Sequence, residues 1–570
     1  MMDSSQRLLF RCDGGSISEV GTGHLRRCLL LIGYHGRRYG SVCKILMRDD
    51  AAGQALIQAS QVPVAVEVIS QEANELSALE RQLKAFQPHL CVFDQLVVSE
   101  EALALCRRHA VVSVAMDAEG TAVEQADIAV NAIREDVRTP YTGPDYITLP
   151  ELPTPAQPDG THRGVHVFIS TGGYDHHRLA PRVVNAVRRL PEIDRIRVVA
   201  ANAELSRQCS MGDQDRRVEV THGVPELSPL LSASDLAVVC GGLTLFEAMR
   251  LGIPSIVVAQ YPHQAATAQR YAARGAVVAL GLASSALEAQ VEHAVAGLIR
   301  TPDRRQALGR VAQHLIDGRG LQRVGDLTRV CELLTWDTEF FGRRIADLKP
   351  LRLTERILDY AFRRCQEWGV ECLYYQSDCH HARSVSLAER HGFHFVDIRL
   401  TFEYQFSAAR RRMARAMPAG LQIRPADIAD LPALQDIASD SYLDSRYYFD
   451  ERFPRERCQT FYTEWIAKCV RGMADRVLVA EQAGHVVGYV ACRRLLPMLG
   501  NLDLIGVHPA ARRQGTGRAL VQAALDYFAT QAVERVQVVT QGRNYPSQRL
   551  YQRCGFVTKH SRLWYHKWFA

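Results

Sequence analysis

The sequence Arg512-Arg513-Gln514-Gly515-Thr516-Gly517-Arg518 decides the fold of the C-terminal part of this chain. It follows an apolar run, 502–507, and leads into a helical pattern, 519–525. A glycine-rich turn between a strand and a helix points backbone N–H groups and the positive end of the helix dipole toward an anion. Gly515 and Gly517 carry no Cβ that would hold a pyrophosphate away from the backbone. The stretch therefore predicts a phosphate-binding loop.

The residues after this loop complete an ordered set. A second strand, Val536 to Thr540, is followed by Asn544 and by a helix that carries Arg549 and Tyr551. The set resembles the GCN5-related N-acetyltransferases. This resemblance implies acetyl-CoA as the co-substrate, Tyr551 as the general acid and a series of cofactor contacts. The implied contacts are Val507, Arg512, Arg513, Gln514, Gly515, Thr516, Gly517, Arg518, Asn544 and Arg549.

Further motifs narrow the resemblance to one branch of that family. They are Phe461-Tyr462-x-x-Trp465, Leu563-Trp564-Tyr565 and, far upstream, Trp336-Asp337-x-Glu339. In these motifs the chain resembles the acetyltransferases that act on dTDP-linked 4-amino-4,6-dideoxygalactose (dTDP-fucosamine). The resemblance covers residues 334–570. It implies that the acceptor is an amino sugar activated by a nucleotide, UDP or dTDP.

Residues 334–406 contain a degenerate copy of the helix that carries Tyr551. The segment 386–393 repeats the pattern of 549–556, but Ala388 stands at the place of Tyr551 and no glycine loop precedes it. We therefore expect a tandem acetyltransferase fold. Its degenerate first half supplies walls but no chemistry.

A phenol is chemically suited to the role that the resemblance gives to Tyr551. The pKa of a tyrosine lies near ~10 and that of a thiol near ~8.5, so a proton can pass to the leaving sulfur as the thioester breaks. The base that deprotonates the substrate ammonium stays open. His508, just past the strand, is one candidate, and an ordinary turn residue is the alternative interpretation.

The N-terminal part, residues 7–324, alternates apolar strands with amphipathic helices. Leu90 to Asp94 reads as a strand, and Glu75 to Phe86 as the helix before it. This rhythm predicts parallel sheets covered by helices. A proline-rich linker, 150–163, interrupts the rhythm, which restarts with Val165 to Ser170. The sequence therefore predicts an α/β pair of doubly wound lobes that face each other across a ligand cleft.

Three glycine-bearing loops follow strands of these lobes, at Gly21-Thr22-Gly23-His24, Gly172-Gly173 and Gly241-Gly242-Leu243-Thr244. Each loop can offer free N–H groups to phosphate oxygens where a helix starts. Glu247 lies one helical turn past the third loop, where a carboxylate can accept hydrogen bonds from ribose hydroxyls. Together the loops indicate a site for a nucleoside diphosphate. The alternative is a set of structural turns that pack helices on their sheets.

The three loops form an ordered series with two further motifs, Arg11-x-Asp13 and Gly143-Pro144-Asp145-Tyr146. This series resembles the GT-B-fold UDP-sugar hydrolases of pseudaminic acid synthesis and the related spore-coat polysaccharide proteins. The hydrolases release UDP from UDP-2,4-diacetamido-2,4,6-trideoxy-β-L-altropyranose, and the resemblance implies catalysis by His24. The substrate contacts expected in the cleft are Asp13, Gly23, Gly172, Gly173, Gly241, Gly242, Thr244, Glu247, His263 and Gln264.

A histidine at position 24 fits the hydrolytic reaction. Attack of water on C1 of the sugar needs a base for the water and stabilisation of the departing diphosphate. Near the positive end of a helix dipole His24 is favoured as the neutral imidazole, the form that a base requires. The alternative is a histidine that only caps the helix or contacts phosphate.

Two positions depart from the hydrolase pattern. The chain reads His263-Gln264 where the family usually has Asn-Gln, and Asp94-Gln95-Leu96 where it usually has Asp-His-Tyr. Both positions would face the sugar. The two halves together predict a bifunctional enzyme that acetylates an amino sugar and hydrolyses its nucleotide link. Glycosyl transfer, or sugar-nucleotide binding without turnover, stays open for the N-terminal half.

Length and composition limit the remaining possibilities. With 570 residues the chain is too long to fold around one hydrophobic core. We predict lobes at 1–152 and 153–328, a degenerate domain at 329–408 and a catalytic domain at 421–570. A net charge of +6 is mild for this length and indicates neither a nucleic acid nor a membrane as partner.

The cysteines and one basic run need no special function. The 15 cysteines show no paired framework, which favours reduced thiols in a cytoplasm. The group Cys365, Cys372, Cys379, His380 and His381 has no zinc-ligand spacing, so we expect no metal. We interpret the basic run 410–415 as a solvated linker between domains.

Overall fold

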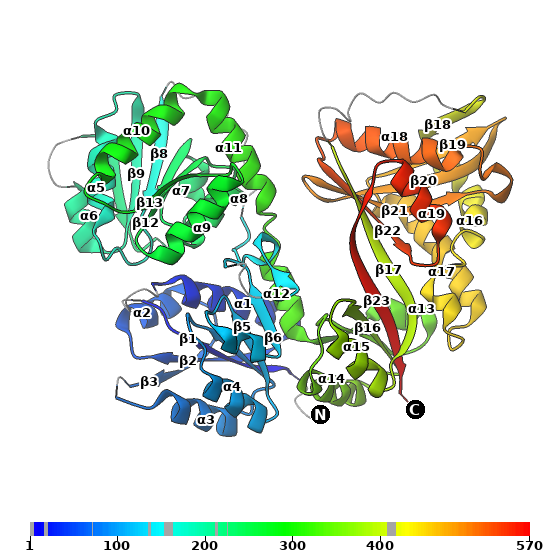
Figure 1. Ribbon diagram of the computed structural model, residues 1–570, viewed down its shortest axis with the longest axis horizontal. Helices are drawn as coiled ribbons and strands as arrows, with labels where there is room; N and C mark the ends of the chain where they lie inside the picture. Colours follow the sequence, from blue (N-terminus) through cyan, green and yellow to red (C-terminus); the bar gives the residue numbers. More distant parts are fainter. Residues whose placement is uncertain are drawn as a thin grey trace. The chain divides into compact units, whose positions relative to one another are not determined.

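The computed structural model describes residues 5–15, 21–70, 72–134, 138–152, 164–210, 215–224, 226–406 and 418–569 (Figure 1). The chain forms two compact units, Met1–Arg329 and Val330–Ala570. The proline-rich linker from residue 153 to 163 and the basic run 410–415 lie outside the described residues. Across the described part of the chain, no helix combines the length and the apolar character needed to cross a membrane.

The first lobe of unit 1 is a parallel sheet with the strand order β3-β2-β1-β4-β5-β6-β7. Its strands are β1 (Arg7–Cys12), β2 (Val42–Arg48), β3 (Ala65–Ile69), β4 (Leu90–Asp94), β5 (Val112–Met116), β6 (Ile128–Asn131) and β7 (Tyr141–Thr142). Its helices are α1 (Gly23–Tyr39), α2 (Ala51–Ser60), α3 (Glu75–Phe86) and α4 (Glu100–Arg108). The central strands β4 and β5 are apolar and buried along their length, as expected for a parallel sheet covered on both faces.

The second lobe repeats this topology with the order β10-β9-β8-β11-β12-β13. Its strands are β8 (Val165–Ser170), β9 (Ile193–Ala200), β10 (Val218–His222), β11 (Leu236–Val239), β12 (Ser255–Ala259) and β13 (Val278–Leu282). Its helices are α5 (Leu179–Arg188), α6 (Ala203–Ser210), α7 (Ser228–Ser232), α8 (Leu243–Arg250), α9 (Pro262–Ala273), α10 (Leu287–Arg300) and α11 (Pro302–Leu315). In chain order both sheets begin 3-2-1-4-5-6, the order of doubly wound dinucleotide-binding folds.

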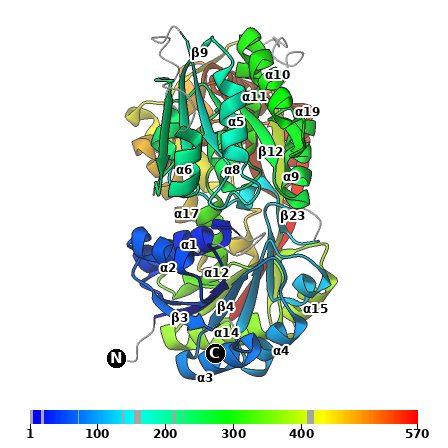
Figure 2. The ribbon, with the colours of Figure 1, turned by 90° about the vertical axis from the view of Figure 1, so that its left-hand side faces the viewer.

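A final helix, α12 (Gly320–Arg329), returns from the second lobe to the first and packs on α1 (Figures 1 and 2). The side chain of Gln6 donates a hydrogen bond to the carbonyl of Thr328 at 3.0 Å. The start and the end of unit 1 are therefore joined in one lobe. The expectation of a GT-B-like pair of doubly wound lobes is confirmed.

Unit 2 is built on one ten-stranded sheet with the order β14-β15-β16-β23-β17-β22-β21-β20-β19-β18. Its strands are β14 (Cys331–Leu333), β15 (Ile345–Leu348), β16 (Cys372–Asp378), β17 (His394–Gln405), β18 (Leu421–Pro425), β19 (Arg476–Gln482), β20 (His485–Leu496), β21 (Leu499–Val507), β22 (Arg535–Gln541) and β23 (Val557–Trp568). Its helices are α13 (Thr335–Phe341), α14 (Glu355–Trp368), α15 (Ala382–Arg390), α16 (Leu431–Ser439), α17 (Arg455–Lys468), α18 (Thr516–Thr530) and α19 (Tyr545–Arg553).

The two acetyltransferase-like segments share this sheet. β17, from the middle segment, lies between β22 and β23 of the C-terminal segment. The expected tandem fold is confirmed, and its two halves are joined by interleaved strands. The finer division of the chain into four domains stays a prediction.

The strands β21 and β22 diverge from one another. They pair in parallel from Leu499 against Arg535 to Leu502 against Val538, and their remaining residues do not pair with each other. The sheet therefore opens at the carboxyl ends of these two strands, next to the point where β21 leads toward α18.

Helix α18 covers the sheet beside this opening. Leu520 and Phe528 are fully buried in a core that includes Val490 of β20 and Val538 of β22. The apolar residues of α18 recur at helical spacing, so one face of the helix packs on the sheet. Packing of α18 therefore supports the edge at which the strands separate.

We predict that Leu520→Ala lowers the free energy of unfolding of unit 2 by about 2–5 kcal/mol, because it leaves a cavity under α18. All five tryptophans, Trp336, Trp368, Trp465, Trp564 and Trp568, belong to unit 2, so tryptophan fluorescence in urea follows this unit. The control is Leu443→Ala, a side chain that is 53% exposed. Equal unfolding midpoints for the two variants would contradict the packing described.

Candidate functional site

The predicted phosphate-binding loop forms a compact turn into α18. Arg513 and Gly515 adopt left-handed backbone conformations, with φ of 61° and 91°. The hydroxyl of Thr516 donates to the carbonyl of Ala511 at 3.2 Å and fixes the start of the helix. The first N–H groups of any α-helix have no acceptor within the helix. The loop thus places such groups at its exposed tip.

The two glycines of this loop have different surroundings. At Gly517 a Cβ would lie 3.3 Å from Cδ2 of Leu550, so this glycine allows α18 and α19 to approach closely. At Gly515 the positive φ favours glycine whatever the space. Gly517 therefore has a packing role, and phosphate binding by the loop stays a prediction.

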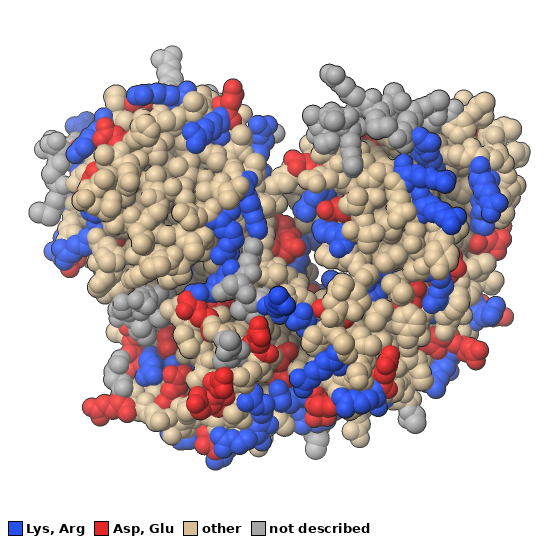
Figure 3. Space-filling model, viewed as in Figure 1, with Lys and Arg blue, Asp and Glu red and all other residues tan. Residues whose placement is uncertain are grey.

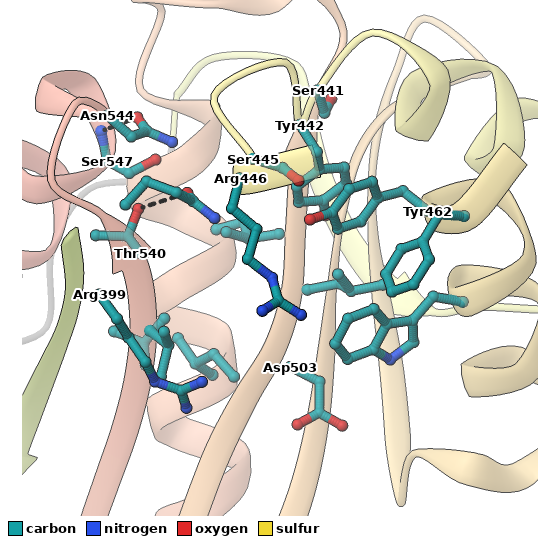
Figure 4. A pocket seen from close by; sticks show the side chains of 18 of the residues that line it. Arg399, Ser441, Tyr442, Ser445, Arg446, Tyr462, Asp503, Thr540, Asn544 and Ser547 are labelled. Carbon is teal, nitrogen blue, oxygen red and sulfur yellow. Dashed lines mark hydrogen bonds between the residues drawn. The ribbon is translucent and has the colours of Figure 1, made fainter. Parts of the chain in front are cut away.

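A pocket of about 680 Å³ opens between the diverging strands of unit 2 (Figure 4). Its walls include residues 502–505 of β21 and 538–541 of β22. Tyr551, on α19, lines the same pocket and is buried. Burial raises the pKa of Tyr551, and a hydrogen bond to Ser547 opposes this only in part. The phenol therefore keeps its proton at neutral pH.

Of the other predicted cofactor contacts, one lines the pocket and the rest lie outside its lining. Asn544 lines the pocket and also caps α19, because its Oδ1 accepts a hydrogen bond from the N–H of Ser547 at 3.1 Å. Outside the lining lie Val507, Arg512, Arg513, Gln514, Gly515, Thr516, Gly517, Arg518 and Arg549.

His508, considered as a base, also lies outside the pocket lining. Its Nδ1 accepts from the N–H of Ala510 at 3.3 Å, as expected of a turn residue. Arg512 is held at the surface, where its Nε donates to the carbonyl of Val507 at 3.0 Å. Neither contact places these side chains near Tyr551.

The far wall of the pocket is aromatic and charged. Tyr442 and Tyr462 stack with ring centroids 4.2 Å apart, and both line the pocket in Figure 4. The aromatic motifs Phe461-Tyr462-x-x-Trp465 and Trp564 were visible in the sequence. The charged lining residues were not predicted as site residues from the sequence, although Asp337 belongs to one of the quoted motifs. They are Asp337, Asp397, Arg399, Arg446, Lys468, Arg493 and Asp503.

A second cavity, of about 730 Å³, lies in unit 1 and has walls from both lobes. Its lining brings together His24 and nine of the ten predicted substrate contacts: Gly23, Gly172, Gly173, Gly241, Gly242, Thr244, Glu247, His263 and Gln264. Asp13 is the exception. Both of its carboxylate oxygens accept hydrogen bonds from the buried Arg11, at 2.7 and 2.8 Å.

The cleft glycines separate into two groups. A Cβ at Gly173 would lie 2.2 Å from Oγ1 of Thr22, and one at Gly241 would lie 2.8 Å from the carbonyl of Gln264. These two glycines are required by close packing. Cβ atoms at Gly23, Gly172 and Gly242 would meet open space. The latter three are therefore the glycines whose backbone a ligand can approach.

His24 lies in the first turn of α1 and is held by Asp94 at the end of β4. Its Nδ1 is 2.5 Å from Oδ1 of Asp94. When neutral His24 donates from Nδ1 to this carboxylate, Nε2 is left unprotonated and can accept a proton. This partner was not predicted from the sequence, where only the helix dipole pointed to a neutral imidazole. Its signal was an acidic residue at the carboxyl end of a strand beside β1.

Asp94 is fully buried and belongs to a small charged network. Arg27 donates to its Oδ1 at 2.5 Å and to its Oδ2 at 3.1 Å, and also pairs with Asp117. Burial alone would raise the pKa of Asp94, but the charge of Arg27 and the hydrogen bonds from His24 and Arg27 outweigh it and lower that pKa. Asp94 therefore stays ionised and holds the imidazole in one orientation.

Two predicted contacts also have structural partners. Oε1 of Gln264 accepts from the N–H of Gln260 at 2.9 Å. The ring of His263 stacks on Tyr261 with centroids 5.7 Å apart. These residues therefore hold the N-terminal end of α9 in place as well as lining the cleft.

Glu247 lines the cleft and forms no ion pair among the described residues. Burial raises its pKa from 4.5 to about 7, and the charge of Arg26 opposes this only weakly. The ionised form is thus less favourable in the folded chain than in the unfolded chain. This cost is absent below about pH 4.5, grows as the pH rises and is complete above about pH 7.

We predict that Glu247→Gln raises the stability of unit 1 at pH 8 by up to about 3 kcal/mol, because the variant removes the buried charge. At pH 4 the variant and the parent should unfold alike. Scanning calorimetry of the full chain at both pH values measures this. The control is Glu292→Gln on α10, where an exposed carboxylate pairs with Arg189. A gain of equal size at both pH values would contradict the account.

Surface charge and metal ligands add little to these two sites. Figure 3 shows acidic and basic side chains interspersed over the face it displays. Within the described residues, no group of three or more His, Cys, Asp or Glu side chains could hold a metal ion.

The two halves of the chain are similar to different known proteins. The N-terminal part is similar to the spore coat polysaccharide biosynthesis protein SpsG of Bacillus subtilis, with 25% identity over 332 residues, 55% of this chain and 94% of that protein. The C-terminal part is similar to dTDP-fucosamine acetyltransferase of Escherichia coli, with 26% identity over 140 residues. That match covers 24% of this chain and 59% of the Escherichia coli protein, so the chain spans about three-fifths of its length.

Two further findings concern the catalytic segment. An uncharacterized N-acetyltransferase of Archaeoglobus fulgidus is 32% identical over 141 residues, 23% of this chain and 89% of that protein. The family model described as Acetyltransferase (GNAT) family matches residues 432–556. The resemblances expected for the two halves are confirmed. Through its C-terminal segment the chain belongs to the GNAT family of acetyltransferases, which use acetyl-CoA.

Proposed function

We propose that this chain is a bifunctional enzyme of pseudaminic acid-type or related surface polysaccharide synthesis. Unit 2 transfers an acetyl group from acetyl-CoA to the amine of a nucleotide-linked 4-amino-4,6-dideoxy sugar. Unit 1 then releases the nucleoside diphosphate by hydrolysis. The observation that carries the proposal is the buried Tyr551 phenol in the opening between β21 and β22.

The acetyl transfer follows from this arrangement. The neutral amine attacks the thioester carbonyl, the C–S bond breaks, and Tyr551 donates its proton to the leaving sulfur. The proton that the nitrogen loses as the amide forms returns to Tyr551 and restores the phenol. The raised pKa keeps Tyr551 protonated until that moment. The loop 512–518 supports the proposal, since its exposed N–H groups and the start of α18 suit the pyrophosphate of coenzyme A. Val507, Asn544 and Arg549 complete the proposed cofactor contacts.

The hydrolysis uses the cleft of unit 1. Nε2 of His24 accepts a proton from water as the water oxygen bonds to C1 of the sugar. The bond from C1 to the diphosphate breaks, and Asp94 stabilises the imidazolium that forms. The open backbone at Gly23, Gly172 and Gly242 suits the departing phosphates.

The remaining cleft residues complete the proposed nucleotide site. Glu247 would accept hydrogen bonds from the ribose, and Thr244, His263 and Gln264 would contact the ligand. Gly173 and Gly241 act through close packing. Asp13 acts through Arg11 and not by lining the cavity.

The names of the relatives support the sugar-nucleotide substrate. One relative acts in spore coat polysaccharide biosynthesis, and the other acetylates dTDP-fucosamine. An amino sugar that carries a nucleotide can enter both sites of a single chain. The bifunctional proposal therefore requires one substrate class only.

Mass spectrometry tests the proposal on products formed from acetyl-CoA and a panel of UDP- and dTDP-linked 4-amino sugars. The proposal expects an acetylated sugar and a free nucleoside diphosphate without any other acceptor. Nucleotide release that requires a second sugar would make unit 1 a glycosyltransferase. Acetylation with no release under any condition would make unit 1 a binding module.

We predict that Tyr551→Phe lowers kcat for acetyl transfer by about 100-fold or more, because the leaving thiolate loses its proton donor. The KM for acetyl-CoA should stay within about threefold of the parent value. The measurement is thiol release by the full chain. Tyr527→Phe, on α18 and outside the pocket lining, is the control. Full turnover by Tyr551→Phe would remove this phenol from the reaction.

We predict that His24→Ala lowers nucleotide release by about 100- to 10,000-fold, while UDP binding measured by calorimetry changes little. Asp94→Asn should show a smaller loss, because it disturbs the orientation of the imidazole but keeps the base. The control is His109→Ala at the end of α4, outside the cleft lining. Unchanged release by His24→Ala would contradict the assigned base.

A further inference from the structure

Arg399 and Arg446 are two of the arginines that line the pocket in unit 2. Arg399 extends from β17, and Arg446 from the 3-10 helix Arg446–Phe449. Both guanidinium groups point into the pocket in Figure 4. A third cation, Arg562 of β23, lies directly opposite Arg399 in the strand register. Three positive groups from different parts of the chain thus meet at one place.

Arg446 is held firmly but not fully hydrogen-bonded. Its Nη2 donates to the hydroxyl of Tyr447 at 2.8 Å. Its guanidinium carbon lies 3.8 Å from the ring centroid of Trp564 and 4.1 Å from that of Tyr374. Nη1 is buried and has no hydrogen-bond partner among the described residues. A buried donor of this kind costs free energy unless a ligand accepts from it.

The guanidinium group of Arg399 has fewer polar contacts than that of Arg446. Within the described part of the chain, its side chain forms no hydrogen bond and no ion pair. Burial, together with the positive charges of Arg562 and Arg446, lowers its pKa to about 10. Asp347 opposes this effect from a distance without forming an ion pair with Arg399. The fold thus places a cation beside other cations without a carboxylate to balance it.

Two of the three carboxylates that line the pocket lie beside other arginines, and the third, Asp337, lies near Arg446. Oδ2 of Asp503 lies 2.7 Å from Nε of Arg493. Oδ1 of Asp397 lies 3.7 Å from Nη2 of Arg543. Asp337 acts on Arg446, whose charge opposes the rise that burial causes in the pKa of Asp337. The charge of Arg399 is therefore left for an anion that enters from outside.

We propose that Arg399 and Arg446 form the subsite that binds the diphosphate of the acetyl acceptor. This inference rests on the proposed function, since it identifies which part of the sugar nucleotide unit 2 recognises. Paired guanidinium groups match phosphate oxygens in geometry and charge. Arg399 belongs to the middle segment, so that segment supplies substrate specificity to the catalytic segment.

The subsite also accounts for the order of the two reactions. Hydrolysis at C1 leaves a sugar without phosphate, and such a sugar has no anion to offer Arg399 and Arg446. Acetylation must therefore come before nucleotide release. A free 4-amino sugar should be a poor acceptor even though its amine is unchanged.

The test measures acetyl transfer to a UDP-linked 4-amino sugar and to the same sugar without the nucleotide. All assays use the full chain with His24→Ala, so that the sugar nucleotide stays intact. We expect Arg399→Gln to raise the KM for the nucleotide-linked acceptor by about 10- to 100-fold, with KM for acetyl-CoA and kcat at saturation nearly unchanged. Arg399→Lys should recover part of the loss, because it keeps the charge.

The matched control is Arg494→Gln, an exposed arginine on β20 outside the pocket lining. With the free amino sugar, Arg399→Gln and the parent should react equally slowly. The inference is overturned if the parent acetylates both acceptors with the same KM, or if Arg399→Gln slows both by the same factor. If the parent acetylates neither acceptor, it is instead the proposed function that fails.

Discussion

The pocket of unit 2 depends on one interruption of strand pairing. β21 and β22 are hydrogen-bonded neighbours up to Leu502 and Val538, and then they separate. Where parallel strands part, their backbone groups face a gap instead of each other, and side chains from both can line a pocket. Tyr551 enters the same pocket from α19. Without the divergence, the phenol would be buried in an ordinary core.

Divergence of this kind requires that each strand be held from its other side. β22 pairs with β17 along its whole length, from Gln541 against Arg399 to Arg535 against Gln405. β21 pairs with β20 up to Val507. The middle segment therefore does more than fill space beside the catalytic segment. Its strand fixes one wall of the opening and carries Arg399 to the pocket.

The features that the sequence predicted correctly are local. The order of strands and helices, the glycine loops and the Tyr551 helix are each written in contiguous residues, and short-range pattern is enough to find them. Nine of the ten predicted contacts in unit 1 line one cleft, because carboxyl ends of parallel strands meet at one edge of a sheet. Asp13 does not line the cleft, because its carboxylate is the counterion of the buried Arg11.

The features that the sequence did not reveal are contacts between distant residues. His24 and Asp94 are 70 positions apart and meet only when β1 and β4 pair. Arg399 and Arg446 come from segments whose adjacency depends on the interleaved strands of unit 2. Spacing rules could not separate the packing glycines, Gly173 and Gly241, from the open ones, because that difference lies in what the neighbouring chain leaves free.

The central claim is that the gap between β21 and β22 receives the thioester of acetyl-CoA. A crystal structure of the full chain with coenzyme A measures this most directly. The account predicts the pyrophosphate against the backbone N–H groups of residues 514–517 and the thiol between the two strands, within reach of the Tyr551 hydroxyl. Coenzyme A bound elsewhere on the chain, with the gap empty, would contradict it.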